Sequence, residues 1–138
     1  MFKSITINAT VNAPMDVVWE AWNNPEHVTE WNHASDDWEC PRAMNDFRVG
    51  GKFVYTMSAI DKSSSFDFSG IYTAITDEKL IAYVMDDGRK VESTFEETDQ
   101  GVNISVTFDL ENENTEALQK DGWQAILNNF KAYAEKQI

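Results

Sequence analysis

The sequence predicts an α+β domain of the helix-grip type, in which a curved antiparallel sheet wraps around a long C-terminal helix. Three observations lead to this fold class. Residues 115–137 carry apolar side chains every three or four positions, the spacing of one face of a helix. Residues 46–108 form short segments in which apolar and polar side chains alternate, and short turns separate these segments. Short turns allow only antiparallel neighbours, so we expect a meander and not a βαβ array.

The C-terminal helix is the element for which the other segments must provide a surface. Its expected apolar stripe comprises Leu118, Gly122, Trp123, Ile126, Leu127, Phe130, Tyr133 and Ala134. The side chains expected to face away from the core are Gln119, Lys120, Asn128, Lys131 and Glu135. Either Asn114 or Thr115 can cap the first turn. Such a helix needs a large concave apolar surface, which the strands are expected to form.

One strand and two short helices are expected before the meander. Residues 4–11 alternate as a half-buried strand does, and Pro14 suits the first position of a helix. The Asn24-Pro25 pair breaks that helix, and residues 26–31 form a second one. Residues 32–44 have no period, and we interpret them as a loop packed at one end of the domain.

About six strands are expected in the middle of the chain. They cover residues 46–49, 52–60, 66–75, 80–85, 90–97 and 102–108. Gly50 and Gly51, between the first two, predict a bulge or a tight turn. They do not form a phosphate loop, because the Gly-Lys-Ser/Thr ending and a following helix are missing.

Composition limits the class of function. The 138 residues suit a single domain, covering 1–138, and the formal net charge of −13 argues against binding to nucleic acid. No apolar run approaches the length of a membrane span, so membrane insertion is not expected. The only cysteine, Cys40, excludes an internal disulfide framework and favours a cytoplasmic location. A homodimer is left open.

Several motifs, taken in order, resemble those of the SRPBCC (START/birch-pollen-allergen-like) superfamily. Within it the chain is most similar to homologues of the activator of the heat-shock-protein ATPase, in their single-domain bacterial form. The segments that carry the resemblance are Ala13-Pro14, Val18-Trp19, residues 31–38, residues 47–51, Phe68-x-Gly70-x-Tyr72, and Gly122-Trp123 with Leu127 and Phe130. The resemblance implies a sheet of about seven strands around the last helix, with a deep apolar cavity between them.

The first functional hypothesis is the binding of a small hydrophobic molecule, such as a lipid, polyketide or aromatic metabolite, in that cavity. No cofactor is expected. We expect Trp31, His33 and Trp38 near the mouth of the cavity. Its lining is expected to contain Phe53, Tyr55, Met57, Phe68, Tyr72, Met85, Trp123, Leu127 and Phe130. For Gly122 inside the helix, close approach of another element is favoured over room left for a ligand.

Two other classes of function are also considered. A cyclase- or hydrolase-like enzyme would use His33 with Asp36 or Asp37 as an acid/base pair at the cavity mouth. The same stretch contains types of residue that bind metals, but its spacing fits no closed zinc pattern, so no metal is expected. An interaction protein that activates a chaperone ATPase is the third class. Eukaryotic members carry an additional chaperone-binding domain, and we expect no such activation from this chain.

Overall fold

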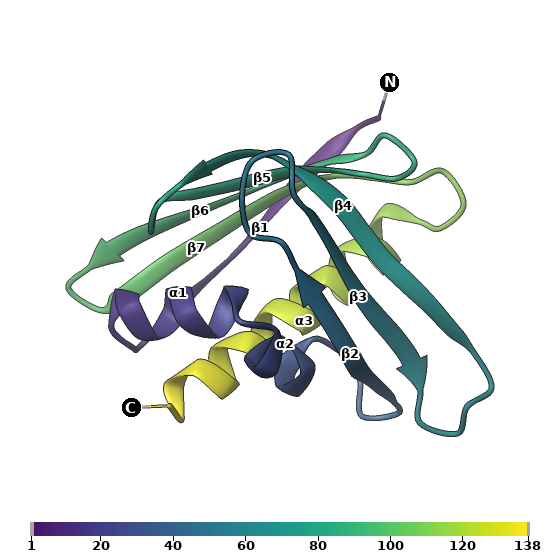
Figure 1. The fold of residues 1–138 in the computed structure, drawn as a ribbon, viewed down its shortest axis with the longest axis horizontal. Helices are drawn as coiled ribbons and strands as arrows, with labels where there is room; N and C mark the ends of the chain where they lie inside the picture. The colour runs from purple at the N-terminus through teal and green to yellow at the C-terminus, as the bar shows by residue number, and fades with distance from the viewer. Residues whose placement is uncertain (1, 138) are drawn as a thin grey trace.

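The computed structural model describes residues 2–137, which form one antiparallel sheet and three helices (Figure 1). The element order follows the expected one. The elements are β1 (Ser4–Val11), α1 (Met15–Asn23), α2 (Pro25–Trp31), β2 (Trp38–Asn45), β3 (Lys52–Ala59), β4 (Ser65–Thr76), β5 (Leu80–Met85), β6 (Lys90–Thr98), β7 (Gly101–Asp109) and α3 (Glu116–Glu135).

Within residues 2–137 the sheet has seven strands in the order β1-β7-β6-β5-β4-β3-β2, with every neighbouring pair antiparallel. The sheet curves strongly, and all three helices lie on its concave side (Figure 1). Helix α3 lies against β1, α1 and α2. The predicted fold class is therefore confirmed: a curved antiparallel sheet holds the long C-terminal helix.

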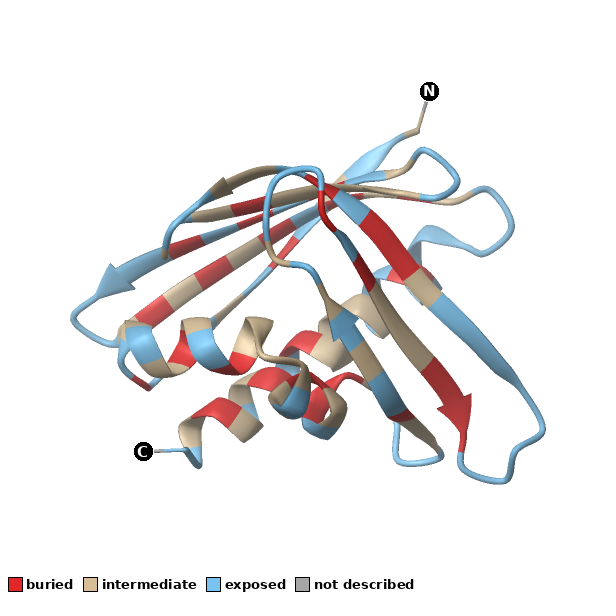
Figure 2. Ribbon diagram, in the orientation of Figure 1, coloured by how far each residue is buried: buried red, intermediate tan, exposed pale blue. Residues whose placement is uncertain are grey.

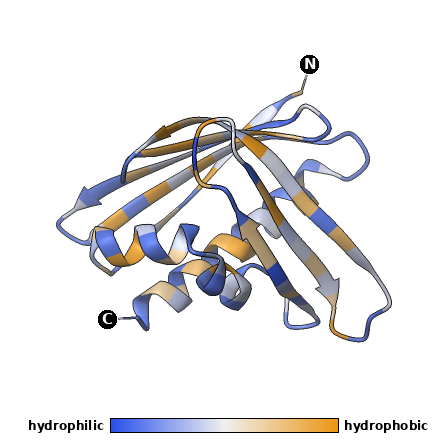
Figure 3. Cartoon of the chain, in the orientation of Figure 1, coloured by the Kyte–Doolittle hydropathy of each residue, from blue (hydrophilic) through white to orange (hydrophobic). Residues whose placement is uncertain are grey.

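Alternation with a period of two decides which side chains face the helices. In β7, Val102, Ile104, Val106 and Phe108 are buried, whereas the residues between them are not. The burial colouring shows these bands along the strands, and the hydropathy colouring follows them (Figures 2 and 3). Strand β1 pairs with β7 from Ser4 opposite Asp109 to Val11 opposite Val102, which extends the same face.

The prediction was wrong at the edge of the sheet. Residues 38–44, expected to lie in a loop, belong to β2, and residues 46–49, expected to be a strand, form the turn that follows it. Strand β2 carries Pro41 and a register shift between Glu39 and Arg42. Proline is tolerated at a sheet edge because no ladder hydrogen bond is required there. Only part of this irregular strand faces the core, so its sequence does not alternate between apolar and polar residues.

Helix α3 begins where a capping residue permits. Thr115 is its N-cap, and the Thr115 hydroxyl accepts a hydrogen bond from the backbone N–H of Leu118 at 3.1 Å. Leu127, Phe130 and Ala134 are buried, as the stripe predicts. These buried apolar residues all lie in the C-terminal half of the helix.

Two residues of the first turn contradict the predicted stripe. Leu118 was expected in the core, but it is 60% exposed. Gln119 was expected to face away, but it is buried. Its side chain closes the loop before the helix: Oε1 accepts from the Glu111 N–H at 2.9 Å, and Nε2 donates to the carbonyls of Glu111 at 3.1 Å and Asn114 at 2.8 Å. A buried amide with both ends satisfied is stable in the core.

The two short helices close one end of the concave face. The Asn24 side chain accepts from the Glu26 N–H at 3.0 Å and so starts α2 directly after α1 ends. The Trp31 indole N–H donates to the Ala21 carbonyl at 2.9 Å and ties the two helices together. The Phe130 ring packs edge-on against the rings of Trp22 and Trp31. The C-terminal half of α3 is thereby fixed.

We predict that Gln119→Leu destabilises the protein by about 1–3 kcal/mol, because the Glu111 N–H and the carbonyls of Glu111 and Asn114 lose the partner they have in the buried Gln119 amide. Urea unfolding followed by circular dichroism gives the free energy of unfolding. Lys120→Leu, at the exposed neighbouring position, is the control and should change it little. Equal stability of Gln119→Leu and the wild type would contradict the proposed anchoring.

A second prediction concerns the turn before β7. Gly101 has φ +124°, and an added Cβ would lie 2.0 Å from the Val11 carbonyl oxygen of the neighbouring strand. Gly88 has φ +93° with nothing within 4 Å. Gly88→Ala should therefore cost only backbone strain of about 1–2 kcal/mol, and Gly101→Ala clearly more. Thermal unfolding of both variants checks the order, and a reversed order would contradict it.

Candidate ligand-binding cavity

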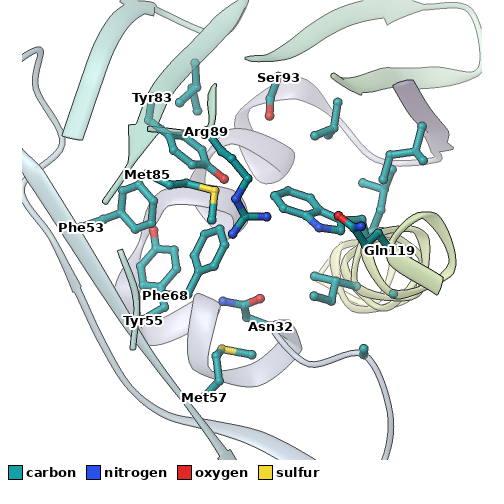
Figure 4. A pocket seen from close by; sticks show the side chains of 18 of the residues that line it. Asn32, Phe53, Tyr55, Met57, Phe68, Tyr83, Met85, Arg89, Ser93 and Gln119 are labelled. Atoms are coloured by element: carbon teal, nitrogen blue, oxygen red, sulfur yellow. The ribbon is translucent and has the colours of Figure 1, made fainter. Parts of the chain in front are cut away.

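A cavity of about 400 Å³ lies between the concave face of the sheet and the N-terminal half of α3 (Figure 4). Its walls come from six strands, from α1 and α2 with the loop that follows α2, and from α3. Most of the lining is apolar or aromatic. The apolar and aromatic residues are Ile7, Trp22, Trp31, Ala34, Phe53, Tyr55, Met57, Phe66, Phe68, Tyr72, Ile81, Tyr83, Met85, Val106, Leu118, Gly122, Trp123, Ile126 and Leu127.

Strand alternation places these side chains. Phe53, Tyr55 and Met57 are successive inward positions of β3, and Ile81, Tyr83 and Met85 are those of β5. Because a strand turns every second side chain to the same face, three residues from each strand line one wall. Figure 4 shows the side chains of Phe53, Tyr55, Met57, Tyr83 and Met85 around the open space.

Aromatic contacts fix the shape of the wall. The ring centroid of Phe53 lies 4.9 Å from that of Tyr55, 5.5 Å from that of Tyr72 and 4.7 Å from that of Tyr83. On the opposite side, the Trp123 ring stacks on Phe108 with a centroid distance of 4.2 Å and an interplanar angle of 8°. Each such pair stabilises the fold by more than its buried area alone would, so the rings around the cavity hold one another in place.

The tyrosines of the wall are neutral at physiological pH. Burial raises the pKa of Tyr72 to about 12, and it also raises the pKa of Tyr55 and of Tyr83 above the usual range. The Tyr72 hydroxyl donates to Asn45 Oδ1 at 2.6 Å. These tyrosines therefore place no negative charge at the cavity wall.

Gly122 faces this open space. A Cβ added to it would meet nothing within 4 Å. The expectation that a neighbouring element approaches the helix at this glycine is therefore wrong. The glycine instead enlarges the cavity, which is the reading that was not favoured from the sequence.

The structure places most of the predicted lining residues at the cavity. Three predicted residues lie elsewhere. Phe130 is fully buried among the tryptophans of α1 and α2, and His33 and Trp38 are not part of the lining. The Trp38 ring instead packs on Phe66, which does line the cavity. The predicted residues that line it are Trp31, Phe53, Tyr55, Met57, Phe68, Tyr72, Met85, Trp123 and Leu127.

The three candidate catalytic residues do not form a site at the cavity wall. Asp36 and Asp37 are exposed, and Asp37 accepts from the Ser35 hydroxyl. Within residues 2–137 no hydrogen bond or ion pair joins the His33 imidazole to either carboxylate. The contact of His33 is structural, because its carbonyl accepts from the Asn129 side chain of α3.

Other reactive groups were also located. Across residues 2–137 no group of three His, Cys, Asp or Glu side chains could hold a metal ion. Burial raises the pKa of the Cys40 thiol to about 11, so it is not a thiolate at neutral pH. In the same range, no helix is both long and apolar enough to cross a bilayer.

The sequence analysis missed the polar part of the lining. The most prominent member is Arg89, whose guanidinium points into the cavity (Figure 4). The alternation along β6 could have identified it. Counting every second residue back from the inward Phe95, Ser93 and Val91 leads to Arg89, so its side chain is expected on the same face. The other polar lining residues are Asn23, Asn32, Ser93, Glu111, Asn114 and Gln119.

Comparison with known proteins agrees with this architecture. The solution NMR structure of the AHSA1-like protein from Aeromonas hydrophila has a TM-score of 0.92 and 41% identity, and the match covers 98% of this chain and 94% of that one. A solution structure from Cytophaga hutchinsonii has a TM-score of 0.83 and 46% identity, covering 97% and 93%. A crystal structure from Chromobacterium violaceum, with a TM-score of 0.86 and 21% identity over 96% and 98%, shares the fold.

Among curated proteins, none matches the chain. The family model described as "Activator of Hsp90 ATPase homolog 1-like protein" matches residues 12–135. That range contains α1, α2, β2 to β7 and α3, and thus nearly the whole fold. The chain therefore belongs to the Activator of Hsp90 ATPase homolog 1-like family, within the SRPBCC superfamily.

Proposed function

We propose that the protein binds a small hydrophobic molecule in the cavity between the sheet and the N-terminal half of α3. The observation that carries the proposal is the open space beside Gly122, in the middle of a helix whose ends are both fixed. A glycine there costs about 1 kcal/mol of helix stability relative to alanine. Alanine would fit without a clash, so packing does not require the glycine.

The size and chemistry of the cavity support this function. A volume of about 400 Å³ lies in the range of about 300–1,000 Å³ typical of small-molecule sites. The lining is mostly apolar, with a few polar groups that can orient a ligand. Met57 and Met85 add flexible side chains that adapt to the shape of a ligand.

The rim of the cavity is also apolar. Phe66 of β4 and Leu118 of α3 both line the cavity, and they are 54% and 60% exposed. Large apolar side chains exposed next to a cavity are typical of a binding site. They mark where a hydrophobic molecule would enter and which surface it would cover.

A titration tests the proposal. Decanoic acid, 1-decanol, 2-naphthoic acid and 2-naphthol are added to ¹⁵N-labelled protein, and amide shifts are recorded by NMR. We expect saturable shifts for at least one compound, concentrated at Met57, Met85 and residues 118–127. If none of the four compounds saturates, or if the shifts lie outside the cavity, the proposal fails.

Substitutions at Gly122 should separate binding from stability. Gly122→Ala removes the helix penalty and should raise the free energy of unfolding by about 0.5–1 kcal/mol. Gly122→Leu places a larger apolar side chain in the cavity and should abolish binding of the compound that saturates in the titration. Urea unfolding and the same NMR titration measure the two effects.

The control for Gly122→Leu is Lys120→Leu, which adds the same side chain at an exposed position of the same helix that does not line the cavity. Its binding should match the wild type. Wild-type affinity in a folded Gly122→Leu variant would show that the ligand lies elsewhere.

A further inference from the structure

We propose that the ligand is an amphipathic carboxylate whose anionic group is bound by the guanidinium of Arg89. This inference rests on the proposed function, because it specifies the chemistry of the molecule in the same cavity. It predicts an acid with one compact apolar body, such as a medium-chain fatty acid or an aromatic carboxylic acid.

The first step in the argument is the position of Arg89. It lies directly after the β5–β6 turn, and its side chain extends the inward series of β6. Its guanidinium projects into the cavity close to Tyr83 and Met85 (Figure 4). Only 16% of the side chain is exposed. A charged side chain shielded from water to this extent is stabilised by anionic or hydrogen-bonding partners.

The second step is the unused part of the guanidinium. Arg89 Nε donates to Asp87 Oδ2 at 2.7 Å, and the Arg89 backbone N–H donates to Asp87 Oδ1 at 3.1 Å. Within residues 2–137 the two terminal nitrogens of Arg89 have no hydrogen-bond partner. The Asp87 contact therefore holds the side chain in place and leaves the pair of terminal nitrogens directed at the open space.

Asp87 does not neutralise the cavity. The Asp87 side chain is 51% exposed, so water outside the cavity solvates and screens its charge. Partial burial opposes ionisation of the carboxyl, but the hydrogen bonds and the charge of Arg89 outweigh it and lower the pKa of Asp87. The pair is thus a surface contact that positions a cation for a second partner inside.

A second Asp-x-Arg pair in the chain shows that an arginine can be paired in this way and still be exposed to water. Arg48 Nε donates to both carboxylate oxygens of Asp46 at 3.1 Å, with the same spacing of two residues. The Arg48 side chain is 69% exposed and does not line the cavity. Local pairing with an aspartate therefore does not require an arginine to be shielded from water, whereas the Arg89 side chain is only 16% exposed.

Within residues 2–137, Arg89 is the only cationic residue that lines the cavity. The only charged lining residues in the described range are Arg89 and Glu111. The Glu111 carboxylate already accepts from the Asn114 N–H at 2.6 Å and from the Asn114 side chain at 3.2 Å. The Tyr83 hydroxyl, also at the cavity, has no hydrogen-bond partner in residues 2–137 and can act as an additional donor.

The geometry of the guanidinium selects the anionic group. Two parallel N–H donors match the two oxygens of a carboxylate, and such bidentate pairs are the strong charge-assisted ones. A phosphate monoester would bring more charge into an apolar cavity, and a two-chain lipid exceeds about 400 Å³. The structure therefore favours a monocarboxylic acid.

Matched ligands test the inference. Calorimetric titrations at pH 7.5 compare decanoate, 1-decanol and decyl phosphate, and a second series compares 2-naphthoate with 2-naphthol. The wild type should bind a carboxylate about ten- to a hundredfold more tightly than the matching alcohol, the range expected for hydrogen bonds to a charged group. Decyl phosphate should bind more weakly than decanoate.

Variants locate the effect. Arg89→Gln should bind the carboxylate and the alcohol with nearly equal affinity. Arg48→Gln, which removes the exposed arginine of the other Asp-x-Arg pair, should keep the wild-type preference. Thermal unfolding tests whether both variants are folded. If Arg89→Gln does not fold, the comparison of matched ligands on the wild type still tests the proposal.

The outcomes distinguish the two proposals. Wild-type protein that binds acid and alcohol equally would overturn anion recognition while supporting hydrophobic binding. A preference for decyl phosphate would assign Arg89 to phosphate and overturn the carboxylate class. A preference for the carboxylate that persists in folded Arg89→Gln would place the anion elsewhere. Absence of binding in every series would overturn both proposals.

Discussion

The fixing of α3 at its two ends is the constraint on which the rest of the structure depends. At one end the buried Gln119 amide holds the loop before the helix, and at the other Phe130 packs among the tryptophans of α1 and α2. Between these anchors the sheet curves away, and the helix presents Gly122 to open space. A helix free at either end could move towards the sheet and close the cavity; this one is held at both ends by contacts within the protein itself.

The walls of the cavity could be predicted from the sequence because they obey a local rule. In β3 and β5 every second residue faces the helix. Alternation placed Phe53, Tyr55 and Met57 on one face of β3, whereas Met85 was chosen because methionine suits an adaptable pocket. Strand β2 could not be found in this way. It is an edge strand with Pro41 and a shifted register, and with few inward contacts its sequence carries little alternation.

The residues of α3 whose surroundings were predicted wrongly have a different explanation. The burial of Gln119 and the exposure of Leu118 depend on where the sheet bends away from the helix, which is a property of seven strands together. The helical period gives the direction of a side chain but not the distance to the next surface. Gly122 was misread for this reason. Arg89 is different, since the period of β6 already placed it inward.

A carboxylate ligand has to be reconciled with a formal net charge of −13. Charges on the surface act through water and salt, and beyond about 8 Å they are largely screened at physiological ionic strength. A guanidinium about 4 Å from an anion, at an effective dielectric constant of about 20, contributes about 4 kcal/mol before the anion's loss of water is counted. The acidic surface therefore slows the approach of an anion, whereas the arginine that lines the cavity decides whether the anion stays bound. Solubility and ligand choice are set by different groups.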